Sequence, residues 1–434
     1  MQRRTFLAGA SAAAILAACS DGEESVDTTL APETTAASTT TTTEATTTTA
    51  AAAPETTTTV PEVLRQPLTG AVVESVDELV ARPALVVKID NHPDSRSNHS
   101  GLAVADVVFE EIVEGVTRFA AVFHTGDSDP VGPIRSGREQ DVDMLASLNL
   151  PLFAWSGGNP GVTRLIAESP FVDLNQTNSA IGDAYYRGPG SAPHDLYSST
   201  EALYALTPSD HPGAPMQLLP YVEPGSAFVG REQVVDVDLL MRFTQVRWEW
   251  DPENGWARFQ DGDRHVDSVH GEIFATNVVV MVAEYGRSSI DANSPFAQTL
   301  GSGAAYVFSD GQVTTGRWRR EAPTDPIDLV DDAGEPIGLT PGSTWVEVAD
   351  NTGDPAFVVA PGATAEAAPD ETTPDSAAAT TSDTATDSSD GTAAGTEAST
   401  PAGPSTPTID LRDPESAPTD IVIRFPEISE ADST

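Results

Sequence analysis

The stretch "FEEIVEGVTRFAAVFH", residues 109–124, contains two apolar runs separated by one glycine. Runs rich in Val, Ile, Phe and Thr predict β-strands, and a glycine between them predicts the turn of a hairpin. If Gly115–Thr117 form a three-residue loop, Glu114 lies opposite Arg118. Because side chains alternate along a strand, Glu110 and Glu114 then share a face with Arg118. The hairpin therefore predicts two carboxylates and a guanidinium on one face of a sheet.

The preceding run "ALVVKID", residues 84–90, predicts a neighbouring strand and contains Lys88, the only lysine of the chain. Alternation places Lys88 and Asp90 on the same side of this strand. A buried ammonium group needs a partner. The nearest acids in sequence order are Glu110, Glu111 and Asp90. Lys88 is thus the inner member of a charged site or one half of a structural ion pair, and both interpretations stay open.

Two arginines follow in "VGPIRSGRE", where Arg135 and Arg138 stand at the start of a predicted helix. A helix N-terminus favours anions, and arginine adds forked donors that suit phosphate or carboxylate. Together with Arg118, these residues predict an anion site. The alternative is internal ion pairing, in which Arg138 pairs with Asp141 or Asp143.

The segment "APHDLYSS" places His194 beside Asp195. Such neighbours serve as a base and its orienting group, or as metal ligands. With Asp90 and His92 they would make a mixed His/Asp metal site, but the spacing matches no zinc signature. Turn capping by Asp195 is the favoured interpretation, and we predict neither a metal nor a cofactor.

The central part of the chain predicts an α+β fold class. Residues 63–225 combine the strands above with short helices and predict an α/β-like N-terminal domain with a mixed sheet. Residues 226–350 alternate apolar and polar positions around Gly-containing turns and predict a β-rich C-terminal domain. Tryptophans 248, 250, 256 and 318 would suit a carbohydrate-binding face, although alternation assigns at least half of them to the core.

Both flanks of this central part are of low complexity. The Thr/Ala-rich segment 19–62 and the acidic segment 351–408 have too few apolar residues for a core, so they predict disordered linkers. In the C-terminal segment 409–434, residues 420–429 alternate like a strand. They form an extra strand of the β-rich domain or belong to a disordered tail, and we leave both alternatives open.

The N-terminal segment 1–18 is typical of an export signal. Arg3 and Arg4 precede an apolar run that is too short to span a membrane, as in twin-arginine signals. The run ends in "LAAC", which resembles a lipobox, so we expect Cys19 to be lipidated. Cys19 is the only cysteine of the chain and therefore has no partner for an intramolecular disulfide. These features predict an exported lipoprotein of the cell membrane that faces the extracytoplasmic side.

The formal net charge of the 434 residues is −44. A strongly acidic chain is repelled by nucleic acids and by anionic membrane surfaces. We therefore expect no nucleic-acid partner, and attachment to the membrane only through the lipid on Cys19.

Four stretches together resemble a known family: "VVKIDNHPDSR", "ADVVFEEIVEGVTRFAAVF", "VGPIRSGR" and "APHDLYSS". With "GSGAAYVFSDGQVTTGRW" and "LTPGSTWVEVA" they are similar to the YerB-like lipoproteins of bacteria, which have paired N- and C-terminal domains of unknown function. The resemblance covers most of residues 65–350. It implies an exported lipoprotein with an α/β-type domain followed by a smaller β-rich domain, and it implies no reaction.

We therefore expect a cell-surface lipoprotein that binds an envelope ligand or a protein partner through a charged site in its N-terminal domain. The expected site residues are Lys88, Asp90, His92, Glu110, Glu114, Arg118, Arg135, Arg138 and His194.

An alternative is an envelope hydrolase or transferase. It would use Glu110 or Glu114 as acid/base, with Asp90 as a further candidate, and the arginines would stabilise anionic charge. A third interpretation is a structural scaffold without a convergent site.

Overall fold

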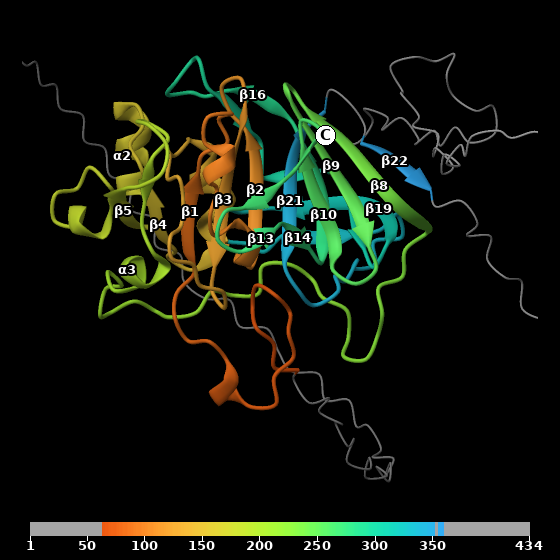
Figure 1. Ribbon diagram of the computed structural model, residues 1–434. Helices are drawn as coiled ribbons and strands as arrows, with labels where there is room; N and C mark the ends of the chain where they lie inside the picture. The colour runs from red at the N-terminus through yellow and green to blue at the C-terminus, as the bar shows by residue number, and fades with distance from the viewer. Residues whose placement is uncertain (1–62, 352–354, 360–434) are drawn as a thin grey trace, which may run out of the picture. The chain divides into compact units, whose positions relative to one another are not determined.

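Strand β1 (Leu85–Ile89) pairs antiparallel with β3 (Thr117–Phe123) and parallel with β4 (Leu152–Trp155). All five residues of β1 are buried, because both faces of the sheet are covered. The computed structural model describes residues 63–351 and 355–359 (Figure 1). The predicted signal peptide, Cys19, the Thr/Ala-rich linker, most of the acidic segment and residues 409–434 lie outside the described residues.

A mixed sheet of 16 strands dominates the described residues. Its main path runs in the order β11-β10-β9-β8-β19-β18-β15-β21-β2-β3-β1-β4-β5, while β14, β20 and β22 pair beside it. The other strands of the first half are β2 (Val107–Ile112), β5 (Val172–Asn175), β6 (Tyr186–Arg187) and β7 (Leu196–Tyr197). The strands of the second half are β8 (Glu232–Met241), β9 (Thr244–Asp251), β10 (Gly255–Gln260), β11 (Asp263–Arg264), β12 (Val266–Asp267), β13 (Gly271–Glu272), β14 (Phe274–Ala275), β15 (Asn277–Ala283), β16 (Tyr285–Arg287), β17 (Pro295–Ala297), β18 (Gly301–Ser309), β19 (Gln312–Arg320), β20 (Asp328–Val330), β21 (Thr344–Asp350) and β22 (Ala356–Val359).

Three short α-helices accompany the sheet in the described part: α1 (Gln140–Leu145), α2 (Pro160–Glu168) and α3 (Thr200–Tyr204). Helices α2 and α3 lie at the β4–β5 end of the sheet (Figure 1). Helix α2 begins where Asn159 accepts hydrogen bonds from two backbone N–H groups of the first turn, and Pro160 occupies the first helical position. None of the helices in the described ranges is long and apolar enough to cross a membrane.

Two apolar layers form the core, one on each face of the sheet. Leu85, Val87 and Ile89 point into one layer, whereas Val86 points into the other. This alternation directs Lys88 to the same face as Val86, as expected from the sequence. The face of Lys88 is also covered by helix α1, which contributes Met144 and Leu145 to the apolar layer.

The sheet runs across the predicted domain boundary at residue 225. Strand β21, from the second half, lies between β15 and β2 and is parallel to both. The division into two domains stays a prediction, but strands of both halves share one hydrogen-bonded sheet.

Most predicted elements are confirmed. The strands around Lys88, the hairpin β2–β3 and the β18–β19 hairpin with its Asp310–Gly311 turn form as expected. Trp248, Trp256 and Trp318 are buried, so they offer no carbohydrate-binding face. Strand β22, which pairs with β8, was missed because it falls inside the stretch assigned to the acidic low-complexity segment.

The predicted register of the β2–β3 hairpin is wrong. The loop has four residues, Val113–Val116, and its ends are joined by a hydrogen bond from the N–H of Val113 to the carbonyl of Val116 (2.9 Å). Glu111 is therefore the residue opposite Arg118, and Glu110 is opposite Phe119. A shift of one residue moves a side chain to the other face of a sheet.

Candidate functional site

Asp90 follows strand β1 and is fully buried, yet its carboxylate is surrounded by cationic groups. The Nδ1 of His194 hydrogen-bonds to its Oδ2, and the Nε of Arg135 lies 3.3 Å from the same oxygen. The NH2 nitrogen of Arg118 lies 3.9 Å from Oδ1. Burial raises the pKa of Asp90, but the hydrogen bond from His194 and the two guanidinium groups outweigh it and lower the pKa below its ordinary value.

Arg118, the second residue of β3, is the most enclosed of the three predicted arginines, with a side chain that is 5 % exposed. It donates to the carbonyl of Ser136 (3.3 Å). Burial, with the nearby charges of Arg138 and Arg135, lowers the pKa of Arg118 to about 10, while Asp90 opposes this shift. The structure thus brings the three predicted arginines close enough to repel one another.

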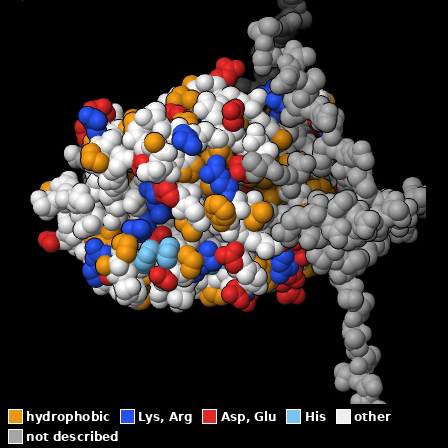
Figure 2. All heavy atoms as spheres, turned by 90° about the horizontal axis from the view of Figure 1, so that it is seen from above, with side chains coloured by type: hydrophobic (Ala, Val, Ile, Leu, Met, Phe, Trp, Pro, Cys, Tyr) orange, Lys and Arg blue, Asp and Glu red, His pale blue; other side chains and the backbone are white. Residues whose placement is uncertain are grey.

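Two histidines lie at the outer side of Asp90. The rings of His92 and His194 stack with their centroids 4.4 Å apart. Figure 2 shows two adjacent histidine side chains on the surface of one face, with several Lys or Arg side chains gathered beside them. Asp195, the predicted turn-capping residue, instead pairs with Arg187 at 2.5 Å.

Lys88 lies deeper on the same face of the sheet. Its Nζ is 2.5 Å from Glu111 and 2.8 Å from Asp141, and all three side chains are fully buried. Gln140 donates to the second oxygen of Glu111 (2.7 Å). Burial and the neighbouring Glu111 raise the pKa of Asp141 to about 6, while Lys88 opposes this shift. Lys88 is therefore enclosed by its ion pairs and does not reach a ligand at the surface.

Glu110 does not join the arginines as expected, and Glu114 contacts one of them, Arg138. Glu110 lies on the opposite face, where it pairs with Arg258 of β10 and accepts a 2.5 Å hydrogen bond from Thr117. Glu114 sits in the hairpin loop, where it pairs with Arg138 at 2.5 Å and accepts a hydrogen bond from Ser294. The loop length explains both corrections, because Val113 and Glu114 leave the strand before the turn.

The opposite face carries a second buried polar cluster around Arg258. Glu347 of β21 lies opposite Glu110 in the sheet and accepts a 2.9 Å hydrogen bond from Trp248. Burial and the adjacent Glu110 raise the pKa of Glu347 well above its ordinary value. From Arg258 a chain of contacts leads through His265 and His99 to the backbone carbonyl of Asp90.

Two sequence profiles of one family match the chain. Residues 68–212 match the profile described as "Protein of unknown function (DUF3048) N-terminal domain", and residues 235–346 match that of the DUF3048 C-terminal domain. The chain belongs to the DUF3048 family. Its N-terminal region holds the whole group around Asp90, and its C-terminal region supplies Arg258 and His265.

Curated and solved DUF3048 relatives agree with this assignment. The chain is 27 % identical over 303 residues to "Putative lipoprotein YerB" of Bacillus subtilis (strain 168), which covers 66 % of this chain and 86 % of that protein. The crystal structure of the YerB protein from Bacillus subtilis superposes with a TM-score of 0.57 at 22 % identity. The match covers 68 % of this chain and 99 % of that chain, and it shows a shared fold.

Sequence reasoning missed three contributors to the charged groups of this DUF3048 chain. Glu111 was considered only as a partner of Lys88, and its place opposite Arg118 depended on the loop length. Arg258 and His265 lie about 150 residues from their partners in the first half, and no local pattern links them. The one sequence signal for Arg258 is its place within a segment that alternates like a half-buried strand.

Two cavities among the described residues are lined by groups other than those that contact Asp90. One of 590 Å³ borders the hairpin loop and is lined by residues that include Glu114, Arg242, Tyr285 and Arg287. Another of 460 Å³ is lined by residues that include Arg82 and Tyr204. Neither lining includes Asp90, Arg118 or Arg135.

Proposed function

We propose that this chain is a membrane-tethered lipoprotein that binds an anionic group of the cell envelope at Arg118 and Arg135. The observation that carries the proposal is the excess of positively charged groups over carboxylates around Asp90. Two guanidinium groups and an imidazole face this one buried carboxylate. A ligand with a phosphate or carboxylate group would supply the missing negative charge.

Arg135 is the residue best placed to meet such a ligand. Its side chain is 22 % exposed, whereas those of Asp90 and Arg118 are almost fully enclosed. Its Nε lies 3.3 Å from Asp90 and is buried without a hydrogen-bond partner, and its two terminal nitrogens make no hydrogen bond to any residue in the described part of the chain. The forked end of the guanidinium is therefore available for two parallel hydrogen bonds to an anion.

Calorimetric titration of the full chain with inorganic phosphate, and separately with succinate, tests the proposal. Replacing Arg135 with Gln removes a charge-assisted contact, so we expect the dissociation constant to rise about tenfold or more. Arg164→Gln is the matched control, since Arg164 is an exposed arginine of helix α2. Absence of binding for both anions, or equal weakening by the two variants, would overturn the proposal.

The lipoprotein part of the proposal rests on Cys19, on the apolar run before it and on the similarity to a relative named as a lipoprotein. Lipidation of Cys19 would hold the anion site at the outer surface of the membrane. Cys19→Ser should move the protein from the membrane fraction to the soluble fraction, and an unchanged distribution would argue against the tether.

Acid/base catalysis by Glu110 and Glu114 with the arginines is not supported. Glu110 is fully buried on the face opposite Arg118, and Glu114 is bound to Arg138 and Ser294. These two carboxylates therefore do not converge on a common substrate position.

A further inference from the structure

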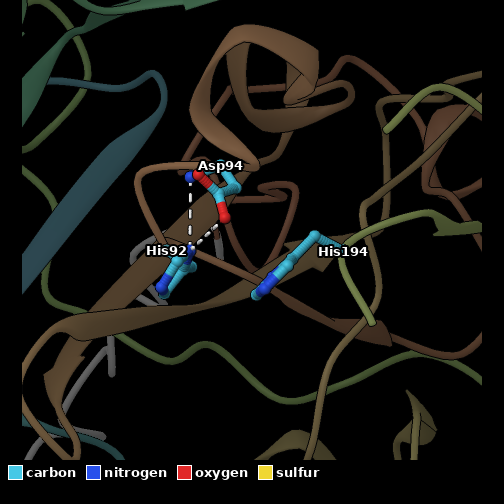
Figure 3. Close-up of side chains that lie close together, drawn as sticks. All are labelled: His92, Asp94 and His194. Atoms are coloured by element: carbon cyan, nitrogen blue, oxygen red, sulfur yellow. Dashed lines mark hydrogen bonds and ion pairs between the residues drawn. The ribbon is translucent and has the colours of Figure 1, made fainter. Parts of the chain in front are cut away.

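We propose that His92, Asp94 and His194 bind a first-row divalent metal ion, of which Zn²⁺ is the best fit. One ligand atom of each residue lies within 4.8 Å of the others. Figure 3 shows His92 and Asp94 on the loop that follows β1, and His194 approaching from a separate segment. The three side chains meet only through the fold, since His194 lies 100 residues after Asp94 in the sequence.

The hydrogen bond of His194 to a carboxylate resembles the one that many metal-binding histidines make. Its Nδ1 hydrogen-bonds to the buried carboxylate of Asp90. A carboxylate can only accept, so Nδ1 carries a proton, and Nε2 is the nitrogen whose lone pair a metal ion would take. A carboxylate behind the imidazole fixes the tautomer and the ring orientation in many metal sites. Asp90 is therefore a positioning residue, while Nε2 of His194 is the ligand atom.

His92 and Asp94 present two electron-rich atoms to each other. The backbone N–H of Asp94 donates to Nδ1 of His92 (3.2 Å), which indicates that this nitrogen carries a lone pair. The Oδ2 of Asp94 lies 3.5 Å from the same nitrogen. Two acceptors at this distance repel each other, and a cation between them would convert the repulsion into attraction.

The group is open to solvent on the side where an ion would enter. The side chains of His92 and Asp94 are 44 % and 71 % exposed, and that of His194 is 12 % exposed. Ligands on one tetrahedral ion lie roughly 3.3 Å apart, given metal–nitrogen bonds of about 2.0 Å. The stacked rings must therefore rotate for their lone pairs to converge, and the exposure of His92 allows this movement.

The ligand set selects the class of ion. Two imidazoles and one carboxylate suit Zn²⁺ and neighbouring first-row ions, whereas Mg²⁺ and Ca²⁺ prefer oxygen ligands alone. Three protein ligands leave at least one coordination position open. This inference goes beyond the proposed anion site, because it rests on residues that the test of Arg135 does not alter.

The test is a titration of the full chain with Zn²⁺, in a Cys19→Ser background that removes the only thiol. We expect saturation at one ion per chain. His92→Ala and Asp94→Asn should each weaken binding about tenfold or more, because each removes one of three ligands. His211→Ala, which alters a histidine bonded to the carbonyl of Leu150, should leave binding unchanged.

A second readout separates loss of ligands from loss of fold. Titration with Co²⁺ in place of Zn²⁺ should give visible absorption bands of a low-symmetry site in wild type and not in His92→Ala. His92 and Asp94 are exposed, so their variants should melt at the wild-type temperature without metal. Asp90→Asn should weaken Zn²⁺ binding roughly 10–100-fold by freeing the ring of His194.

Two results would overturn the inference. One is the absence of a one-ion saturation in wild type. The other is Zn²⁺ binding that persists within twofold in both His92→Ala and Asp94→Asn. Arg135→Gln separates the two proposals, since it should weaken phosphate binding about tenfold or more but leave Zn²⁺ binding unchanged.

Discussion

The Nζ of Lys88 lies 2.8 Å from Oδ1 of Asp141, and this contact joins strand β1 to helix α1 away from water. The same ammonium group also binds Glu111 of β2. One cation thus connects two strands and a helix beneath the arginine group. Buried charges of this kind are stable only while each keeps its partner.

Replacing Lys88 with Met should destabilise the protein strongly. The change leaves Glu111 and Asp141 buried without a cation, which costs about 3–5 kcal/mol in comparable cases. Denaturant unfolding monitored by tryptophan fluorescence gives the free energy of unfolding. The control is Arg264→Met, which breaks the half-exposed pair with Glu272 and should change this free energy by less than about 1 kcal/mol. Similar values for the two variants would show that Lys88 is not an essential counter-ion.

The stability of the fold should depend on pH through Asp141. Its pKa of about 6 in the folded state lies above the ordinary value of an aspartate. Between about pH 4 and pH 6 the folded state holds a proton that the unfolded state has released. The free energy of unfolding contributed by this group therefore falls as the pH rises through that window.

Asp141→Asn should remove this contribution. The groups that face Asp141 are Lys88, Glu111 and the backbone N–H of Arg138, and none of them is altered by the change. Unfolding curves of wild type and variant, measured from pH 4 to pH 7, should differ in slope by up to about 1 kcal/mol per pH unit. Parallel curves would contradict the assigned role of Asp141.

Glu110 and Glu347, which lie on the sheet face opposite Lys88, should respond differently to replacement by glutamine. Glu110→Gln leaves the guanidinium of Arg258 buried without a counter-ion, so we expect a loss of about 3–5 kcal/mol. Burial and the adjacent Glu110 raise the pKa of Glu347 well above its ordinary value, which favours its neutral form. Glu347→Gln keeps the group neutral and should cost less than about 1 kcal/mol. Denaturant unfolding at pH 7 compares them, and a larger loss for Glu347→Gln would reverse the assignment of charge.

The sequence was sufficient to predict the strands and much of the residue set at Asp90. The continuous apolar run around Lys88 indicated a buried strand, and alternation placed Lys88 and Asp90 on one side of it. Arg118, Arg135 and His194 were predicted as site residues, and all three contact Asp90. The positions of these residues follow from local periodicity and from the pairing rules of charged groups, whereas their role in binding a ligand stays a prediction.

The register of the β2–β3 hairpin could not be predicted from the local sequence. A loop of three residues and one of four fit the sequence around Gly115 equally well, yet they exchange the faces of Glu110 and Glu111. The choice is made by contacts from elsewhere, such as Ser294 with Glu114 and Tyr285 with the N–H of Ile112. The partnership of Glu110 with Arg258 likewise depends on the whole sheet.

The insertion of β21 between β2 and β15 has a consequence for any attempt to separate the two family regions. Without β21, strand β2 would present a bare row of N–H and carbonyl groups, and without β2 the same would hold for β21. Such edges recruit strands from other molecules and start aggregation. Each region therefore covers an edge strand of the other and keeps it from pairing with strands of other molecules.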